Sequence, residues 1–265
     1  MAWNLPLTTD FAQSFTSEFV ANQGGFKPSN QSGLGVWLDA SDLSTLTFNG
    51  STISAWANKG NTGAGNAVQA TTSAQPLYIA SSINSLPALR GRHDGTNPSQ
   101  LLITDSAALN YTTFEMFVVY KRNTDLGAIE MIGGKYAVIG NQREMRVLIS
   151  ASDQLAVAAG TDGTAGTLAQ ATFGSAAALN TPYVANGRYD ATNLIVQQNN
   201  GTAVTAALAS IFAGTVGFSV FSRDTTFADP AAIDLSEILF FTAIRTVSER
   251  TQINNYLSAK YGISL

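Results

Sequence analysis

The chain has 265 residues, enough for one large β-domain with appendages or for two small domains. Only 12% of its residues are charged and its net charge is −4, so we expect no nucleic-acid partner. It has no cysteine, which excludes disulfides and thiolate metal sites. Residues 1–10 lack the basic and apolar regions of a secretory signal, and no apolar run reaches the roughly 20 residues needed for membrane insertion.

Residues 1–32 differ in pattern from the rest of the chain. Phe11, Phe15 and Phe19 recur at every fourth position, which places their rings on one face of a helix. A helix this short is marginal alone, so its Phe face must pack either on the chain's own domain or on a neighbouring subunit. We expect a short helical arm that anchors the protein to a partner through Trp3 and the three phenylalanines.

The pattern becomes β from residue 36 onward. Residues 36–38 are β-formers, and Asp39 and Asp42 end them with side chains that favour a tight loop. Trp56 belongs to a second run of this kind, which a turn at residues 58–60 closes. We expect these two runs to be partner strands joined through a polar turn, with both tryptophans in the core.

Many more short runs of β-formers follow, separated by Gly, Asn, Asp, Ser or Pro. They are residues 77–79, 101–103, 116–120, 136–139, 145–149, 155–158, 183–185, 194–197, 215–221 and 233–241. Asn199-Asn200-Gly201 indicates a hairpin turn, and Gly133-Gly134-Lys135 is interpreted as another. Residues 159–182 are too rich in Ala, Gly and Thr to assign. Short strands with frequent turns predict an all-β sandwich or jelly roll.

The end of the chain predicts a strand followed by a helix. Residues 233–241 are almost continuously apolar, as in a strand buried on both faces. Thr246 and Glu249 have the spacing of a capping box, and Gly262 can end the helix in the left-handed conformation. The expected apolar stripe of this helix consists of Val247, Ile253, Tyr256, Leu257 and Tyr261.

Both ends of the main domain resemble a known family. The entry motif is Trp37-Leu38-Asp39-Ala40-Ser41-Asp42, followed by Trp56, Asn58, Gln75-Pro76-Leu77-Tyr78 and Asn84-Ser85-Leu86-Pro87-Ala88. With the closing strand at 234–241 and the helix motifs Val247-Ser248-Glu249-Arg250 and Lys260-Tyr261-Gly262, it resembles laminin-G/concanavalin-A-like domains of phage virion proteins and bacterial surface proteins.

The likeness covers residues 33–265 and leaves 1–32 outside. It implies a concanavalin-A-like jelly-roll β-sandwich that includes a C-terminal helix at 246–262. Arg92-His93 departs from the family pattern, which has an apolar residue at that point, before the Asp-Gly at 94–95.

The carboxylates do not have the pattern of an enzyme. Glycoside hydrolases of this architecture resemble one another in a Glu-x-Asp-x-x-Glu strand, whose alternation turns the carboxylates into one groove. None of the six glutamates here has that spacing. His93 is the only histidine, so a catalytic triad or a zinc site would depend on it alone. We therefore expect no enzyme, with His93 a surface or structural residue.

Calcium is the cation to consider, because lectin-like sandwiches often hold it through loop oxygens. The candidate ligands are Asp39 with Asp42, and the group Asp224, Asp229 and Asp234. Such residues in β-loops usually serve turns, so we expect no cofactor, with calcium as the alternative.

The resemblance and the weakly charged surface together favour a non-enzymatic structural protein on the virion surface of a tailed phage, made in the host cytoplasm. It would be a head decoration or a tail or fibre component, with other virion proteins as partners and a homo-oligomeric state. The alternative is a glycan-binding module that recognises a host surface glycan. That function would require exposed aromatic faces with amides or carboxylates nearby.

Overall fold

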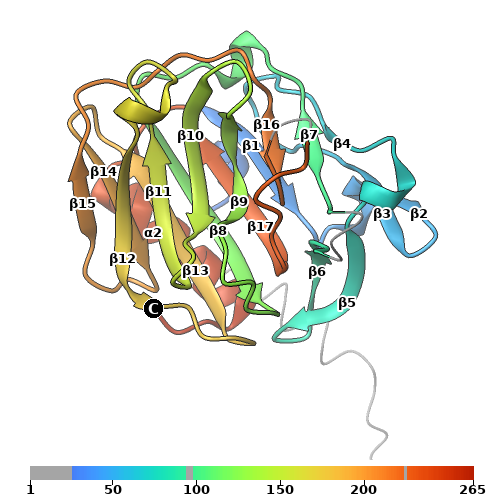
Figure 1. Cartoon of the computed structure of the whole chain (residues 1–265). Coiled ribbons are helices and arrows are strands. Elements are labelled where there is room, and N and C mark those ends of the chain that lie inside the picture. The colour runs from blue at the N-terminus through green and yellow to red at the C-terminus, as the bar shows by residue number, and fades with distance from the viewer. Residues whose placement is uncertain (1–25, 94–97, 224–225) are drawn as a thin grey trace, which may run out of the picture.

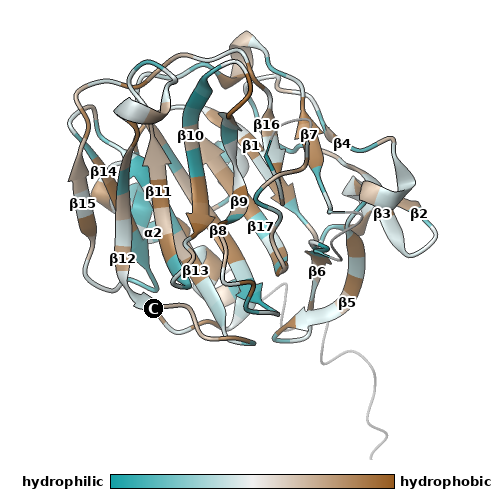
Figure 2. Cartoon of the chain, viewed as in Figure 1, coloured by the Kyte–Doolittle hydropathy of each residue, from teal (hydrophilic) through white to brown (hydrophobic). Residues whose placement is uncertain are grey.

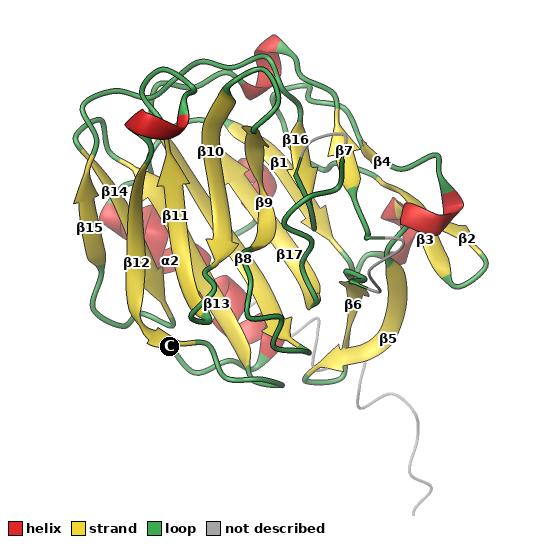
Figure 3. Ribbon diagram, viewed as in Figure 1, coloured by secondary structure: helices red, strands yellow, loops and turns green. Residues whose placement is uncertain are grey.

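The protein is described by a computed structural model that covers residues 26–93, 98–223 and 226–265. Two layers of antiparallel strands face each other, and helix α2 (Val247–Tyr261) lies behind the back layer (Figures 1 and 3). The strands are β1 (Leu34–Asp39), β2 (Leu46–Asn49), β3 (Thr52–Trp56), β4 (Ala67–Val68), β5 (Leu77–Ile83), β6 (Leu86–Arg90), β7 (Leu101–Ile103), β8 (Phe114–Arg122), β9 (Glu130–Ala137), β10 (Gln142–Ile149), β11 (Gln154–Ala159), β12 (Ala169–Ala176), β13 (Pro182–Tyr189), β14 (Asn193–Gln198), β15 (Val204–Ala207), β16 (Phe218–Val220) and β17 (Ile233–Phe241).

Strand β17 is the centre of the back layer. It pairs with β8 along its whole length, and both β6 and β1 pair with its other edge. Strands β13, β14 and β15 continue the layer beyond β8. The front layer runs β4, β7, β16, β9, β10, β11, β12, while β3 pairs with both β4 and β5 and so links the layers at one edge.

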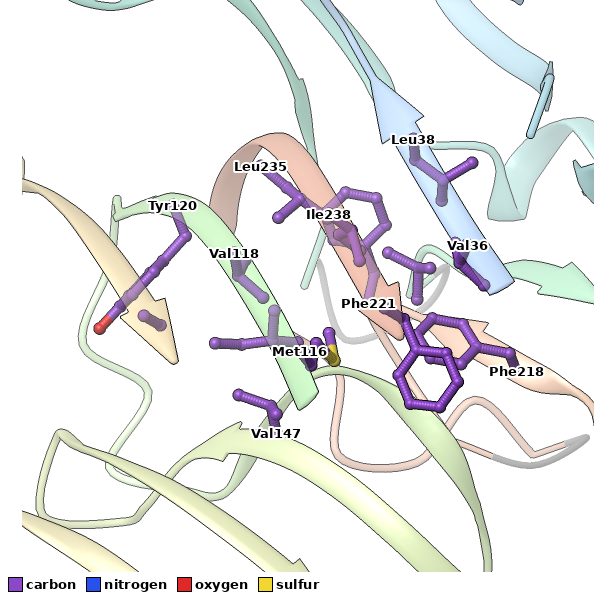
Figure 4. Close-up of a cluster of buried hydrophobic side chains, with 14 of the residues drawn as sticks. Val36, Leu38, Met116, Val118, Tyr120, Val147, Phe218, Phe221, Leu235 and Ile238 are labelled. Carbon is purple, nitrogen blue, oxygen red and sulfur yellow. The ribbon is translucent and has the colours of Figure 1, made fainter. Parts of the chain in front are cut away.

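The main hydrophobic core fills the space between the two layers. Hydrophobic residues are concentrated on the strands in Figure 2, and the close-up in Figure 4 shows their side chains meeting between β1, β8, β10, β16 and β17. A second cluster lies on the outer face of the back layer, where Ile253, Leu257 and Tyr261 of α2 pack on Phe117 and Leu239. The helix is therefore part of the fold rather than an appendage.

The elements with local sequence signals form as predicted. Thr246 caps α2 through a complete capping box with Glu249, and Gly262 ends the helix at φ +61°. Asn199 and Asn200 both have positive φ at the hairpin between β14 and β15. The apolar run at 233–241 is β17, and every one of its residues is buried.

Other predictions about the strands are wrong. Strands β1 and β3 are not partners, because β1 pairs with β17 and β3 with β2. Gly133-Gly134-Lys135 is not a hairpin turn but lies within β9, where Gly134 takes φ +149° opposite Arg146. Residues 138–139, 215–217 and 221 lie outside the strands, and the unassigned stretch contains β12.

Val247 and Trp37 are less buried than predicted. Val247 is 76% exposed at the first helical position, so it does not belong to the buried stripe of α2. Trp56 is fully buried as expected, whereas Trp37 is only partly buried, and the Lys59 ammonium lies 4.0 Å from its ring centroid.

Within the described ranges, no helix has the length and apolar character needed to cross a membrane.

Candidate functional site

A pocket of about 260 Å³ opens where β6, β8 and β17 run side by side. The end of β6 and the residues after it supply one wall, and the loop after β8 supplies another. Its lining residues are Arg90, Gly91, Arg92, His93, Asn123, Thr124, Leu126 and Ala232. Most of these side chains carry hydrogen-bond donors, and none is acidic.

Asp234, near the start of β17, has a carboxylate with no solvent exposure that positions two of the lining residues, Arg90 and Asn123. Arg90 of β6 binds it with two hydrogen bonds, from Nε to Oδ1 at 2.6 Å and from Nη2 to Oδ2 at 2.9 Å. Asn123 donates to Oδ1 at 2.8 Å, and Ser82 donates to Oδ2. Lys121 of β8 lies 3.4 Å from the same carboxylate. The pairing of three strands thus fixes the positions of Arg90 and Asn123.

These contacts keep Asp234 ionised. Burial alone would raise the pKa of its carboxyl, but the hydrogen bonds from Arg90, Ser82 and Asn123 outweigh burial and lower the pKa. The same contact raises the pKa of the Arg90 guanidinium, against the opposing effect of its partial burial.

Among the described residues that line or underlie the pocket, cations outnumber carboxylates. Asp234 neutralises one of its two neighbouring cations, Arg90 and Lys121, and leaves the second charge uncompensated. Arg92 adds another cation: it donates to the carbonyl oxygen of Gln75 at 2.8 Å, and no carboxylate of the described residues lies within ion-pair distance of it. The pocket is therefore suited to an anionic or hydroxyl-rich ligand.

A second hollow of about 240 Å³ lies on the outer face of the front layer, between β7, β9 and β16. Leu102, Ile139 and Val216 make most of its lining apolar. Tyr136 also borders it, but this side chain is only 4% exposed and the Arg146 guanidinium stacks on its ring at 4.1 Å. This hollow offers no open aromatic face for a sugar.

The anchoring residues predicted in the arm, Trp3, Phe11, Phe15 and Phe19, lie outside the described residues. Asp224, one of the calcium candidates, does so as well.

Each of the other candidate calcium ligands binds a basic side chain of the protein. Asp39 contacts both Lys59 and Lys260, and Asp42 contacts Lys59. Asp229 pairs with Arg146 and Arg223, and Asp234 has the partners described above. Within the described ranges, no three acidic or histidine side chains lie together as metal ligands would. The carboxylates are structural partners of lysine and arginine here.

The described glutamates are likewise engaged in structural contacts. Glu115 binds Arg250 and Asn186, and Glu130 accepts from the backbone NH of Ala232. Glu237 accepts from the indole of Trp37 at 2.8 Å. Of the other two, Glu144 binds Lys135 and Glu249 takes part in the capping box of α2. Both described pockets lack a facing pair of carboxylates, so neither has the arrangement used for glycoside hydrolysis.

Sequence reasoning did not predict this pocket. It noted Arg92-His93 only as a departure from the family pattern and interpreted His93 as a surface or structural residue, whereas the structure places both residues in the lining. Arg90, Asn123 and Asp234 were missed as a group because β6, the residue after β8 and β17 are distant in sequence.

No protein-family model matches the sequence, and no curated protein matches it. Among solved structures, the chain is similar to the binding domain of Paraclostridial Mosquitocidal Protein 1, with a TM-score of 0.61 and 9% identity over 87% of this chain and 53% of that one. It is also similar to the binding domain of botulinum neurotoxin serotype D/C VPI 5993, with a TM-score of 0.55 and 10% identity over 87% and 53% of the two chains. The chain thus spans about half the length of these toxin binding domains. The likeness establishes the all-β sandwich fold.

Proposed function

We propose that this chain is a non-enzymatic glycan-binding domain and that the pocket beside Arg90 and Arg92 is its site. The observation that carries the proposal is the lining itself, which brings guanidinium, imidazole, amide and hydroxyl groups together without a carboxylate. No phenylalanine, tyrosine or tryptophan lines this pocket, so binding would depend on hydrogen bonds and charge rather than on the exposed aromatic faces expected from the sequence. A sugar presents hydroxyl oxygens that such donors bind, and an acidic sugar adds a carboxylate that an arginine binds well.

The size of the pocket limits the ligand. Its volume of about 260 Å³ lies just below the roughly 300–1,000 Å³ that drug-sized ligands occupy, so it suits a single sugar ring with the rest of the glycan in solvent. The floor is rigid because Arg90 and Asn123 are already held by Asp234, and a preorganised site loses less entropy on binding.

The neighbours in fold support this proposal. One of them is the binding domain of botulinum neurotoxin DC in complex with SialylT, with a TM-score of 0.50 and 11% identity over 64% of this chain and 42% of that one. The β-sandwich hosts many functions, so the proposal depends on the pocket, and the likeness in fold is only supporting evidence.

A glycan array followed by titration of the best ligand tests the proposal. Wild-type protein should give a selective, saturable signal, and His93→Ala and Thr124→Val should each weaken it by up to about tenfold, the effect of one lost hydrogen bond. Both side chains are exposed, so neither change should affect folding. Lys27→Ala, at an exposed cation on the first described segment, should bind as wild type. No saturable glycan signal, or binding that both pocket variants retain, would overturn the proposal.

A role on a phage particle is a separate proposal about where such a domain would be displayed, and the sequence resemblance over residues 33–265 favours it. The arm would then anchor the domain to other virion proteins, in a homo-oligomer, with the pocket facing the host. Deletion of residues 2–25 tests this role: incorporation into particles should fail while the purified domain still binds glycan. Unchanged incorporation would refute the anchoring role.

A further inference from the structure

The Lys135 side chain is buried at one end of the space between the two layers. It belongs to β9, and its side chain is 1% exposed. Its Nζ lies 3.0 Å from Oδ1 of Asp105, in the segment after β7, and 3.2 Å from Oε2 of Glu144 in β10. Neither contact has hydrogen-bond geometry, so Lys135 Nζ and Asp105 Oδ1 are buried atoms without a hydrogen-bond partner within the described ranges. The two ion pairs therefore place a buried amine within reach of two carboxyl groups.

The cluster is bordered by apolar core residues, and its surroundings make the Glu144 carboxylate a stronger proton acceptor than an exposed glutamate. The ring of Tyr111 lies 5.8 Å from the Lys135 Nζ and packs edge-on against Phe114 and Phe240 of the core. Burial raises the pKa of the Glu144 carboxyl, although the charge of Lys135 opposes it. In such a low-dielectric site, proton transfer from an ammonium to a carboxylate costs far less than it does in water.

We propose that Lys135 and Asp105 condense into an intramolecular amide, with Glu144 as the proton carrier. One ammonium proton passes to the Asp105 carboxylate, and the neutral amine then attacks Cγ to form the N–C bond. Glu144 takes a second proton from the nitrogen and delivers it to the departing hydroxyl. The Cγ–O bond breaks, one water molecule leaves, and Glu144 returns to its starting form. The reaction needs no further reagent.

The position of Glu144 fits this role. Its Oε2 faces Lys135 and is held by the backbone NH of Gly214 at 2.9 Å. The side chain therefore has a fixed orientation and is 2% exposed, which keeps its proton from exchanging freely with solvent.

The bond would join two elements that β16 separates. Strand β16 has three residues, and it pairs with β7 on one side and β9 on the other. A link from Lys135 of β9 to the segment after β7 would cross this short strand and close a covalent loop between positions 105 and 135. In a chain without cysteine, such a link would constrain the unfolded state as a disulfide does.

Intact-mass spectrometry of the folded, purified protein tests the proposal. Wild type should weigh one water molecule less than its sequence, and a tryptic digest should contain one branched peptide joining Lys135 to Asp105. Asp105→Ala and Glu144→Gln should each have the full mass of their sequences, whereas Asp125→Ala, at an exposed acid, should still lack one water.

Wild-type protein at its full sequence mass would overturn the proposal, and this result does not depend on whether any variant folds. A branched peptide at another pair of residues would overturn it as well. If Glu144→Gln still lost water, the bond would stand but its assigned proton carrier would be wrong.

Discussion

Lys260, in the last turn of α2, places its Nζ 2.7 Å from Oε2 of Glu237, a carboxylate with no solvent exposure at the centre of β17. The same ammonium lies 2.9 Å from Oδ1 of Asp39 in β1. The hydroxyls of Tyr256 and Tyr261 donate to Glu237 at 3.0 and 2.9 Å. The helix is therefore held on the sheet by a charged network as well as by its apolar face.

Replacing Lys260 with methionine should destabilise the protein by about 3 kcal/mol, because it leaves Glu237 and Asp39 buried with one cation fewer. The estimate takes the lower end of the range for broken buried pairs because the lysine side chain is 19% exposed. Urea denaturation measures the effect. Lys27→Met, at an exposed lysine, should change the free energy of unfolding by less than about 0.5 kcal/mol. Equal losses in the two variants would contradict this account of the network.

Asp39 should make stability depend on pH in the acid range. Burial raises the pKa of its carboxyl, but the Lys260 ammonium, with smaller contributions from Ser41 and Lys59, lowers it from 3.8 to about 2. Because the folded pKa is below the unfolded one, this stabilisation is complete above pH 3.8 and is lost as pH falls through about 2.

The pH dependence can be measured by comparing wild type with Asp39→Asn. At about pH 5 the variant should be less stable by about 2 kcal/mol, and the difference should shrink as pH falls toward about 2. Denaturant titrations at several pH values give these free energies. A difference that stays constant over this range would show that Asp39 does not have the lowered pKa.

Local signals explain why part of the fold could be predicted from the sequence. The cap at Thr246 depends on a residue three positions away, and the turn at Asn199 and Asn200 depends on neighbouring backbone angles. The partner of β3 and the interior position of Gly134 depend instead on which strands pair, and pairing is decided by contacts far apart in the chain.

The same distinction applies to the candidate site. Arg92 and His93 could be noted as unusual because they depart from the family pattern at one place in the sequence, but nothing in the sequence showed that they line a pocket. The contact of Arg90 with Asp234 joins residues of two strands, and no spacing in the sequence predicts it. The ion pairs of Lys135 could not be predicted for a related reason, because Asp105 and Glu144 belong to other elements of the fold.

The capping box of α2 should contribute to the stability of the whole domain. The side chain of Thr246 accepts a hydrogen bond from the Glu249 backbone NH, and the Glu249 carboxylate accepts one from the Thr246 NH at 2.8 Å. Thr246→Ala should lower the free energy of unfolding by about 1 kcal/mol, as loss of a helix cap usually does. Thr251→Ala, at an exposed position within the same helix, is the matched control and should be nearly neutral. A loss confined to Thr251→Ala would refute the cap's contribution.

Gly134 should tolerate no side chain, although it lies within a strand. A Cβ at this position would lie 2.4 Å from the carbonyl oxygen of Met145 and 2.8 Å from Cα of Arg146, and its φ of +149° is one that other residues rarely adopt. Gly134→Ala should therefore destabilise the protein by about 1–3 kcal/mol from backbone strain alone, with the clash adding to it.

Gly166→Ala is the matched control, because a Cβ there would meet no atom within 4 Å. It should leave the thermal midpoint near that of wild type or raise it slightly, since alanine restricts the unfolded chain. Thermal denaturation of the two variants side by side measures the contrast. Equal midpoints would mean that β9 and β10 can separate enough to admit a methyl group. In that case, the close approach of the two strands would not be the reason for a glycine at position 134.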